Sequence, residues 1–252
     1  MFRFRFAASA AALLLSAGAM TACAYNEELG RSQVLFVDDA SLAQASATAW
    51  QETLQQGRVS QNAADNARVR GVGERIVSAA GLGNLPWQYV VFDDPDANAF
   101  VLPGGRMGVN TGLLRLVRND DQLAAVIGHE VAHTAARHAA ERQSSTALAQ
   151  IGLTVAGAAA GDGRVGQAIG QFGGAGAQLG FLLPFSRRHE LEADRLGVDY
   201  MQRAGFRPRE AVSLWRTMQA QSGQRPPQFA STHPSEETRI AELERYIAGR
   251  GW

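Results

Sequence analysis

Apolar residues recur at helical spacing in two stretches near the start of the chain. Residues 39–56 and residues 62–80 carry Ala, Leu, Val and Ile in this pattern, with Gly57 between them. Side chains three and four residues apart lie on one face of an α-helix. The pattern therefore predicts two amphipathic helices, and Gly81 and Gly83 mark the end of the second.

The pattern then changes to one that favours β-strands. Residues 87–92, Trp-Gln-Tyr-Val-Val-Phe, are rich in aromatic and β-branched side chains and follow Pro86. Residues 99–102 and 106–110 predict two more short strands, joined by a Pro-Gly-Gly turn at 103–105. Together these segments predict a small antiparallel sheet that flanks the helices of a mainly α-helical, α+β domain.

Helical spacing returns after the sheet. Asn119 and Gln122 form a capping-box pattern, which predicts a third helix that runs to about Arg142. Residues 144–184 are dominated by Ala and Gly, and glycines four residues apart let helices approach closely. Gln, Thr and charged residues interrupt this stretch, so we expect a helical hairpin or lid there rather than a membrane-spanning segment.

The N-terminal segment, residues 1–22, is predicted to be a secretory signal. Two Arg residues precede an apolar stretch over residues 7–19, which is too short to span a bilayer as a helix. The following Met-Thr-Ala-Cys at 20–23 resembles a bacterial lipobox, in which the Cys is lipidated and becomes the N-terminus. We therefore expect a lipid anchor on Cys23 and a periplasmic location, at the outer rather than the inner membrane. Ordinary signal-peptidase cleavage after Ala24 is the alternative.

Composition narrows the chemistry that the chain can perform. It has 24 basic residues, all of them Arg, and 24 acidic residues, so its formal charge is zero. A neutral chain has no general attraction to nucleic acid, and nucleic-acid binding is not expected. Its single cysteine, Cys23, cannot form a Cys-rich metal site. Any metal ion must therefore be held by His and carboxylate side chains.

The predicted third helix contains the motif His-Glu-Val-Ala-His at residues 129–133. Residues four apart on a helix differ in direction by only about 40°, so His129 and His133 can reach the same Zn²⁺ ion. Glu130 projects beside this pair, where its carboxylate can accept a proton from the attacking water without binding the metal. Burying two His and a Glu among apolar neighbours would be costly without a metal ion. We therefore expect one zinc ion per chain.

A third protein ligand must come from elsewhere in the chain. On a continuous helix His138 would point about 140° away from His133, so it is expected at the surface or behind the ligands. A later charged segment predicts a fourth helix, on which Glu190 and Asp194 share one face. We assign Glu190 as the third ligand and Asp194 as the acceptor for the free ring N–H of a zinc-bound His. The adjacent His189 is an alternative ligand, and a solvated charged helix face is the alternative without a metal.

These motifs resemble the HtpX and CAAX-prenyl-protease type of zinc metallopeptidase, within the gluzincins. With the lipobox, the chain looks most like the small bacterial periplasmic lipoprotein members. The resemblance implies a zinc endopeptidase with His129, His133 and Glu190 as ligands and Glu130 as catalytic base. It spans roughly residues 60–247 and includes, besides the motifs above, the segments Arg-Gly-Val-Gly-Glu-Arg-Ile at 70–76, Asn-Ala-Phe at 98–100, Thr-Gly-Leu-Leu at 111–114, Ala-Gly-Phe at 204–206 and Ser-Thr-His-Pro at 231–234.

The expected reaction assigns two further parts of the site. The oxyanion formed during peptide hydrolysis needs a donor besides zinc, and His233 is assigned this role. Alternatively, His233 is a fourth zinc ligand in a closed resting site, or it has only a structural role. Arg239 is a weaker candidate for the oxyanion donor. An edge strand beside the zinc can bind an extended substrate through main-chain hydrogen bonds, which favours unfolded segments. This strand is expected at Asn98, Ala99 and Phe100.

The predicted organisation is a lipoprotein signal peptide at 1–22, an N-terminal anchor or linker with the first helix at 23–58, and a zinc metallopeptidase domain at 59–252. The expected function is hydrolysis of peptide bonds in unfolded or misassembled envelope proteins, with membrane contact through the lipid anchor. A catalytically silent zinc-binding chaperone or assembly factor and an integral membrane protease are the alternatives. The sequence leaves the oligomeric state and any partner protease open.

Overall fold

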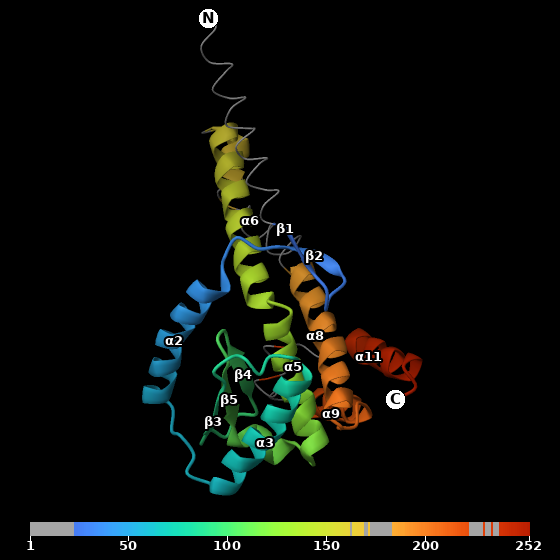
Figure 1. Cartoon of the computed structure of the whole chain (residues 1–252). Coiled ribbons are helices and arrows are strands. Elements are labelled where there is room, and N and C mark those ends of the chain that lie inside the picture. The colour runs from blue at the N-terminus through green and yellow to red at the C-terminus, as the bar shows by residue number, and fades with distance from the viewer. Residues whose placement is uncertain are drawn as a thin grey trace, which may run out of the picture. The chain divides into compact units, whose positions relative to one another are not determined.

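The computed structural model (Figure 1) describes residues 23–161, 163–168, 171, 183–221, 229, 233 and 237–252. The predicted signal at 1–22 and most of the return arm of the predicted hairpin lie outside these residues. The chain divides into two compact units. The smaller unit comprises residues 1–38 and 140–182, and the larger comprises residues 39–139 and 183–252.

The smaller unit contains a two-stranded antiparallel hairpin that the sequence pattern did not predict. Its strands are β1 (Cys23–Asn26) and β2 (Arg31–Val34). Most of helix α6 (His138–Ala160) belongs to the same unit and covers the first part of the stretch for which a helical hairpin or lid is predicted. The carboxylate of Glu141 on α6 accepts two hydrogen bonds from the Arg31 guanidinium of β2, at 2.7 and 2.9 Å. This partly buried ion pair joins the strands to the helix. Among the described residues, no helix is long and apolar enough to cross a membrane.

In the larger unit the first two predicted helices are confirmed. Helix α2 spans Asp39–Gln56 and helix α3 spans Ala63–Ala79. The side chain of Asn62 caps α3 by accepting hydrogen bonds from the main-chain N–H groups of Ala64 and Asp65. The buried face of α3, which includes Ile76, contributes to the core as the apolar spacing predicts.

The three predicted strands also form, and they confirm the α+β class. They are β3 (Gln88–Phe92), β4 (Ala99–Leu102) and β5 (Arg106–Asn110), in the order β3-β5-β4. Strands β4 and β5 pair antiparallel as predicted, but β3 pairs with β5 in parallel, so the sheet is mixed. The loop at residues 93–98 connects β3 to β4, which lie on opposite sides of β5 in the sheet. A tight turn then connects β4 to β5, which occupies the centre. Strand β4 is therefore at the edge of this sheet.

Helix α5 (Asp120–Ala135) lies at the centre of the larger unit. It packs against β4 on one side and against α3, α8 (Leu183–Arg203) and α9 (Arg209–Gln221) on others. Figure 1 shows α8, α9 and α11 (Glu237–Gly249) gathered on the side of α5 away from the sheet. A short helix, α4 (Thr111–Leu116), links β5 to α5. Because α5 is surrounded, nearly all of its residues from 122 to 132 are buried.

The predicted third helix ends earlier than expected. Helix α5 stops at Ala135, and α6 begins at His138 rather than continuing the same helix. Between them Arg137 has a φ of 53°, in the left-handed region that non-glycine residues rarely adopt. The prediction of one helix to Arg142 is therefore wrong. The sequence has no Gly or Pro between residues 134 and 142 to indicate a break, so the helical pattern continues across it.

Helices α5 and α8 touch through their backbones at two glycines. A Cβ atom added to Gly128 would lie 2.9 Å from the carbonyl oxygen of Gly197, and one added to Gly197 would lie 3.0 Å from the main-chain nitrogen of His129. Real Cβ atoms do not approach main-chain atoms this closely without displacement. The separation of the two helices is therefore set by the absence of side chains at both positions.

A methyl group at this crossing is expected to destabilise the protein. For Gly128→Ala the free energy of unfolding should fall by about 1–3 kcal/mol, because α5 and α8 must move apart. Gly71→Ala on α3 is the matched control, since its Cβ would meet nothing within 4 Å. That substitution should be neutral or stabilise by up to about 1 kcal/mol. Chemical denaturation followed by circular dichroism measures both, and equal stabilities would contradict the proposed constraint.

Candidate active site

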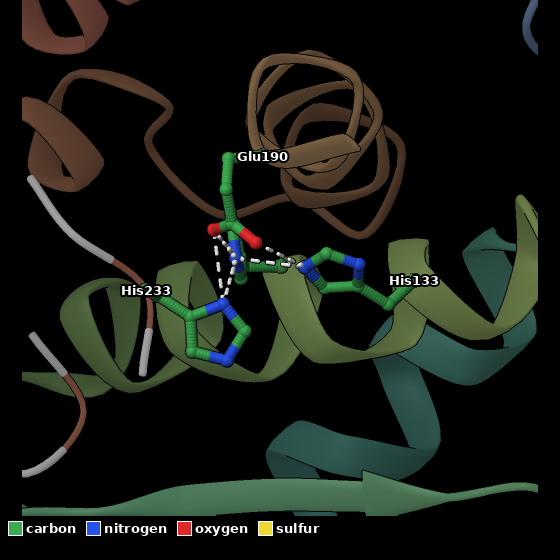
Figure 2. A group of neighbouring side chains, drawn as sticks. His133, Glu190 and His233 are labelled. Carbon is green, nitrogen blue, oxygen red and sulfur yellow. Dashed lines mark hydrogen bonds and ion pairs between the residues drawn. The ribbon is translucent and has the colours of Figure 1, made fainter. Parts of the chain in front are cut away.

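Four side chains converge beside the α5–α8 crossing. His129 and His133 come from α5, Glu190 comes from α8, and His233 lies between α9 and α11. Each offers one nitrogen or oxygen atom, and these atoms all lie within 4.8 Å of one another. Figure 2 shows the side chains of His133, Glu190 and His233 pointing toward a common centre. The structure thus brings together the three predicted ligands and His233.

The separations of these atoms fit a tetrahedral zinc site. Ligand atoms about 2.0–2.1 Å from a tetrahedral zinc ion lie about 3.3 Å from one another. The Nε2 atoms of His129 and His133 are 3.1 Å apart. Oxygen atoms of Glu190 lie 3.2 Å from Nε2 of His129 and 3.5 Å from Nε2 of His133. Imidazole nitrogens and a carboxylate at these distances are a donor set that suits Zn²⁺.

The other ring nitrogen of His129 is held by a buried carboxylate, as predicted for Asp194. Nδ1 of His129 lies 3.0 Å from Oδ1 of Asp194. Arg239 on α11 donates to both oxygens of Asp194, at 2.6 and 2.9 Å, and lies 3.2 Å from Glu190. Burial opposes the charged form of Asp194, but the Arg239 guanidinium and the His129 hydrogen bond outweigh it and lower its pKa. Arg239, a weaker candidate for an oxyanion donor, instead holds this carboxylate.

Charge in the site favours a cation. Burial lowers the pKa of His129, yet hydrogen bonds with Asp194 and Glu190 outweigh this effect and raise it to about 9. Burial raises the pKa of Glu190, but hydrogen bonds with His129 and His233 bring it well below its ordinary value. Burial and the nearby charge of His129 keep the pKa of His133 well below 6.5, so its ring is neutral. The two ionised carboxylates thus favour positive charge beside the His ligands.

Glu130 lies next to the ligands and points one oxygen into the site. Its side chain is buried, and Oε1 lies 3.3 Å from Nε2 of His233. Within the part of the chain that the structure describes, no hydrogen bond reaches Oε1. Burial raises the pKa of Glu130, although the charges of His233 and His129 and a hydrogen bond from the main chain of Val101 oppose the rise. A buried carboxylate with an open acceptor is equipped to receive a proton.

His233 is positioned by a stack of aromatic rings. Its ring stacks on Phe229 with centroids 4.8 Å apart, and Phe229 stacks on Trp215 of α9 at 5.6 Å. Nδ1 of His233 lies 2.9 Å from Oε2 of Glu190 and 3.2 Å from Nε2 of His129. The main-chain N–H of Phe229 donates to the carbonyl of Ala97, just before β4. His233 therefore occupies the fourth corner of the ligand cluster.

The expected edge strand lies beside this cluster. Ala99 and Phe100 belong to β4, and Asn98 immediately precedes it. Strand β4 packs against α5, and the main chain of Val101 within it acts to lower the pKa of the Glu130 carboxyl. Oδ1 of Asn98 is buried and accepts no hydrogen bond from the residues described. Strand β4, an edge strand of the described sheet, thus lies beside the helix that carries Glu130.

Two His residues lie behind the cluster rather than in it. His138 is fully buried, with Nδ1 2.9 Å from Nδ1 of His133, because the break at Arg137 redirects it. The ring of His189 stacks on that of His138 with centroids 4.1 Å apart. His189, the alternative ligand, is therefore not among the four converging side chains. His138 thus occupies one of the two positions expected for it, behind the ligands, whereas no sequence motif pointed to Phe229.

An HExxH helix with a Glu ligand from a second helix is the arrangement of zinc metallopeptidases. The mixed sheet with its edge strand along that helix is consistent with this class. The chain belongs to peptidase family M48, whose match covers residues 63–247.

Relatives of this chain include both mitochondrial and bacterial proteins. The mitochondrial metalloendopeptidase OMA1 of Schizosaccharomyces pombe is 40% identical over 181 residues, which cover 71% of this chain and 52% of the relative. The β-barrel assembly-enhancing protease of Escherichia coli is 31% identical over 186 residues, covering 69% of this chain and 37% of the relative. The metalloendopeptidase OMA1 of Bos taurus is 32% identical over 234 residues, which cover 86% of this chain and 45% of the relative. The chain thus spans about half, or less, of the length of these relatives.

Proposed function

We propose that this protein is a zinc-dependent endopeptidase that cleaves unfolded or misassembled proteins of the bacterial cell envelope. His129, His133 and Glu190 hold the ion, and Glu130 is the general base. The observation that carries this proposal is the buried Oε1 of Glu130, which accepts no hydrogen bond from the described residues. It lies beside the two imidazole nitrogens and the Glu190 carboxylate, whose atoms are 3.1 to 3.5 Å apart. Membership of peptidase family M48 supports the same chemistry.

Different residues of the site have different roles in the proposed peptide hydrolysis. When bound, zinc polarises the scissile carbonyl and lowers the pKa of water to about 7. Glu130 accepts the proton of the attacking water and passes it to the leaving amine nitrogen. Its raised pKa suits both steps, since a catalytic group works best with a pKa near the working pH. Asp194 and Arg239 keep Nδ1 of His129 protonated, so that its Nε2 faces the ion.

The edge of β4 is the proposed binding site for the substrate. An extended peptide can add to this edge by main-chain hydrogen bonds, and such pairing does not depend on side-chain sequence. Only a segment that lacks its own secondary structure can present free N–H and C=O groups. This supports unfolded or misassembled proteins as substrates.

The envelope location rests on the N-terminal sequence and on one relative. The lipobox-like residues 20–23 support a lipid anchor on Cys23 and, with it, attachment to the outer membrane. The Escherichia coli relative is named for enhancing β-barrel assembly, which supports a role in envelope quality control. The HtpX and CAAX-protease resemblance remains part of this proposal, as a narrower relationship within the family.

The substitution Glu130→Gln is expected to abolish hydrolysis while zinc stays bound. Gln cannot accept the proton, and loss of general-base catalysis costs about 10²- to 10⁴-fold in rate. Digestion of casein and of an unfolded outer-membrane protein, with metal analysis of the same sample, tests this. Glu74→Gln on α3 is the matched control and should cleave at the wild-type rate. Persistent cleavage by the zinc-loaded Glu130→Gln protein would refute the assigned mechanism.

His233→Ala is expected to raise the rate of peptide hydrolysis several-fold. Nδ1 of His233 occupies the fourth corner of the cluster, where water and the substrate carbonyl must enter, so we infer a closed resting site. Cleavage of a short unstructured fluorogenic peptide measures the change, and zinc content should stay at one ion per chain. A lower rate would instead favour His233 as the oxyanion donor. If neither protein cleaves any substrate, the chaperone alternative gains.

Cys23→Ser is expected to release the protein from the membrane. Ser cannot form the thioether that links the lipid to the protein. Without acyl chains the protein has no proposed attachment to the membrane. Fractionation of cells that express each form, with metabolic labelling by a fatty acid, measures the effect. Met20→Leu, which brings the sequence closer to a lipobox, should remain in the membrane fraction. Equal membrane retention and no label on the wild type would favour cleavage after Ala24.

A further inference from the structure

The two zinc-binding His residues are supported in different ways. Nδ1 of His129 faces the ionised carboxylate of Asp194 at 3.0 Å. Nδ1 of His133 faces no carboxylate at this distance among the described residues. It faces Nδ1 of His138 instead, at 2.9 Å. A neutral imidazole can accept one hydrogen bond and donate another, so His138 can link His133 to a further acceptor.

That further acceptor is Glu192 of α8. Nε2 of His138 lies 3.0 Å from Oε2 of Glu192. Glu192 lies between Glu190 and Asp194 in sequence but points to a different side of the helix. Its side chain is 14% exposed, whereas that of His138 is only 1% exposed. Little water can therefore compete for the nitrogens of His138.

Zinc binding through Nε2 of His133 would set the direction of both hydrogen bonds. His133 can bind zinc through Nε2 only if Nε2 is bare, so its proton must be on Nδ1. Nδ1 of His138 must then accept that proton's hydrogen bond. The proton of the neutral His138 ring is consequently on Nε2, which donates to Glu192. No other arrangement of protons on the two neutral rings satisfies both contacts together with a metal ion.

The fold places His138 in this position by a local backbone break. On a continuous helix residues 133 and 138 would point about 140° apart. The left-handed conformation of Arg137, with φ of 53°, interrupts the helix and brings the His138 ring back to His133. Stacking on His189, with an interplanar angle of 13°, then restricts rotation of the His138 ring. Uncommon backbone conformations of this kind cluster at functional sites.

We propose that His138 is a positioning residue for zinc binding, acting with Glu192 to fix the tautomer and the ring orientation of His133. The proposal rests on the zinc site put forward above. His138 does not touch the metal or the substrate. It acts by presenting one acceptor where the Nδ1–H of His133 must point, while its own N–H is held by Glu192. The pair does for His133 what Asp194 and Arg239 do for His129.

Zinc affinity of the full-length protein tests the proposal directly. In His138→Leu, His133 loses its acceptor, and we expect zinc to bind about 10- to 100-fold more weakly in competition with a chelator. In His138→Gln, the amide oxygen can accept from His133 and the amide nitrogen can donate to Glu192. We expect this variant to recover most of the affinity. Glu244→Gln on α11, which pairs with Arg216 at the surface, is the control and should bind like wild type.

A second readout separates positioning from folding. Cobalt substituted for zinc reports ligand geometry through its visible spectrum, which should change in His138→Leu and return toward the wild-type spectrum in His138→Gln. A purely structural role would lower the melting temperature of the metal-free protein and leave affinity and spectrum unchanged. If His138→Leu does not fold, Glu192→Ala replaces it, since Glu192 is partly exposed, and the same loss of affinity is expected in smaller measure.

The outcomes distinguish the two proposals. If the wild type binds one zinc ion and both His138→Leu and Glu192→Ala bind it with wild-type affinity, the positioning role is refuted and the zinc site stands. If His138→Gln is as weak as His138→Leu, the hydrogen-bond argument is refuted. If the wild-type protein itself binds no zinc, the proposed function fails and this inference fails with it.

Discussion

The backbone contact between Gly128 and Gly197 is the constraint on which the site depends. His129 follows Gly128 directly, so its side chain leaves α5 beside the crossing point. On α8, Asp194 and Glu190 precede Gly197 by three and seven residues, about one and two turns, and so lie along the same face. A tetrahedral zinc ion needs ligand atoms about 3.3 Å apart. If side chains held the two helices further apart, the side chains of Glu190 and His129 could not bring their ligand atoms to this separation.

Charge compensation is the second requirement, because the crossing buries two carboxylates. Glu190 and Asp194 both ionise in a region with little water, which is costly without positive partners. Arg239 contacts both, at 3.2 and 2.6 Å, and its guanidinium lies 4.4 Å from the centroid of the Trp215 ring. The raised pKa of His129 lets its ring carry charge as well. Without a metal ion the carboxylates are therefore compensated by Arg239 and by a protonated His129, whose Nε2 would have to lose its proton before it could bind zinc.

The parts of the structure that follow from local spacing could be predicted from the sequence, and the parts that depend on tertiary contacts could not. Helical periodicity gave α2, α3 and α5, and the four-residue spacings placed His129 with His133 and Glu190 with Asp194. The parallel pairing of β3 with β5 depends on where a loop crosses the sheet. The break at Arg137 has no Gly or Pro beside it, so the contact between His138 and His133 could not be derived, although a position behind the ligands was one of the two expected for His138. The stacking of Phe229 on His233 joins residues without any shared motif.

These differences explain why an HExxH motif alone does not make a metal site. The motif fixes where the two imidazoles leave the helix, but the terminal torsion of a His side chain is broad, and either nitrogen could face the ion. A contact from outside the helix must therefore determine which nitrogen faces the ion. For His129 that contact comes from α8, with Arg239 of α11 behind it, and for His133 it comes from the first residue of α6. The proposed zinc-binding geometry thus depends on four helices: α5 carries both His residues, α8 and α11 set the tautomer of His129, and the start of α6 sets that of His133.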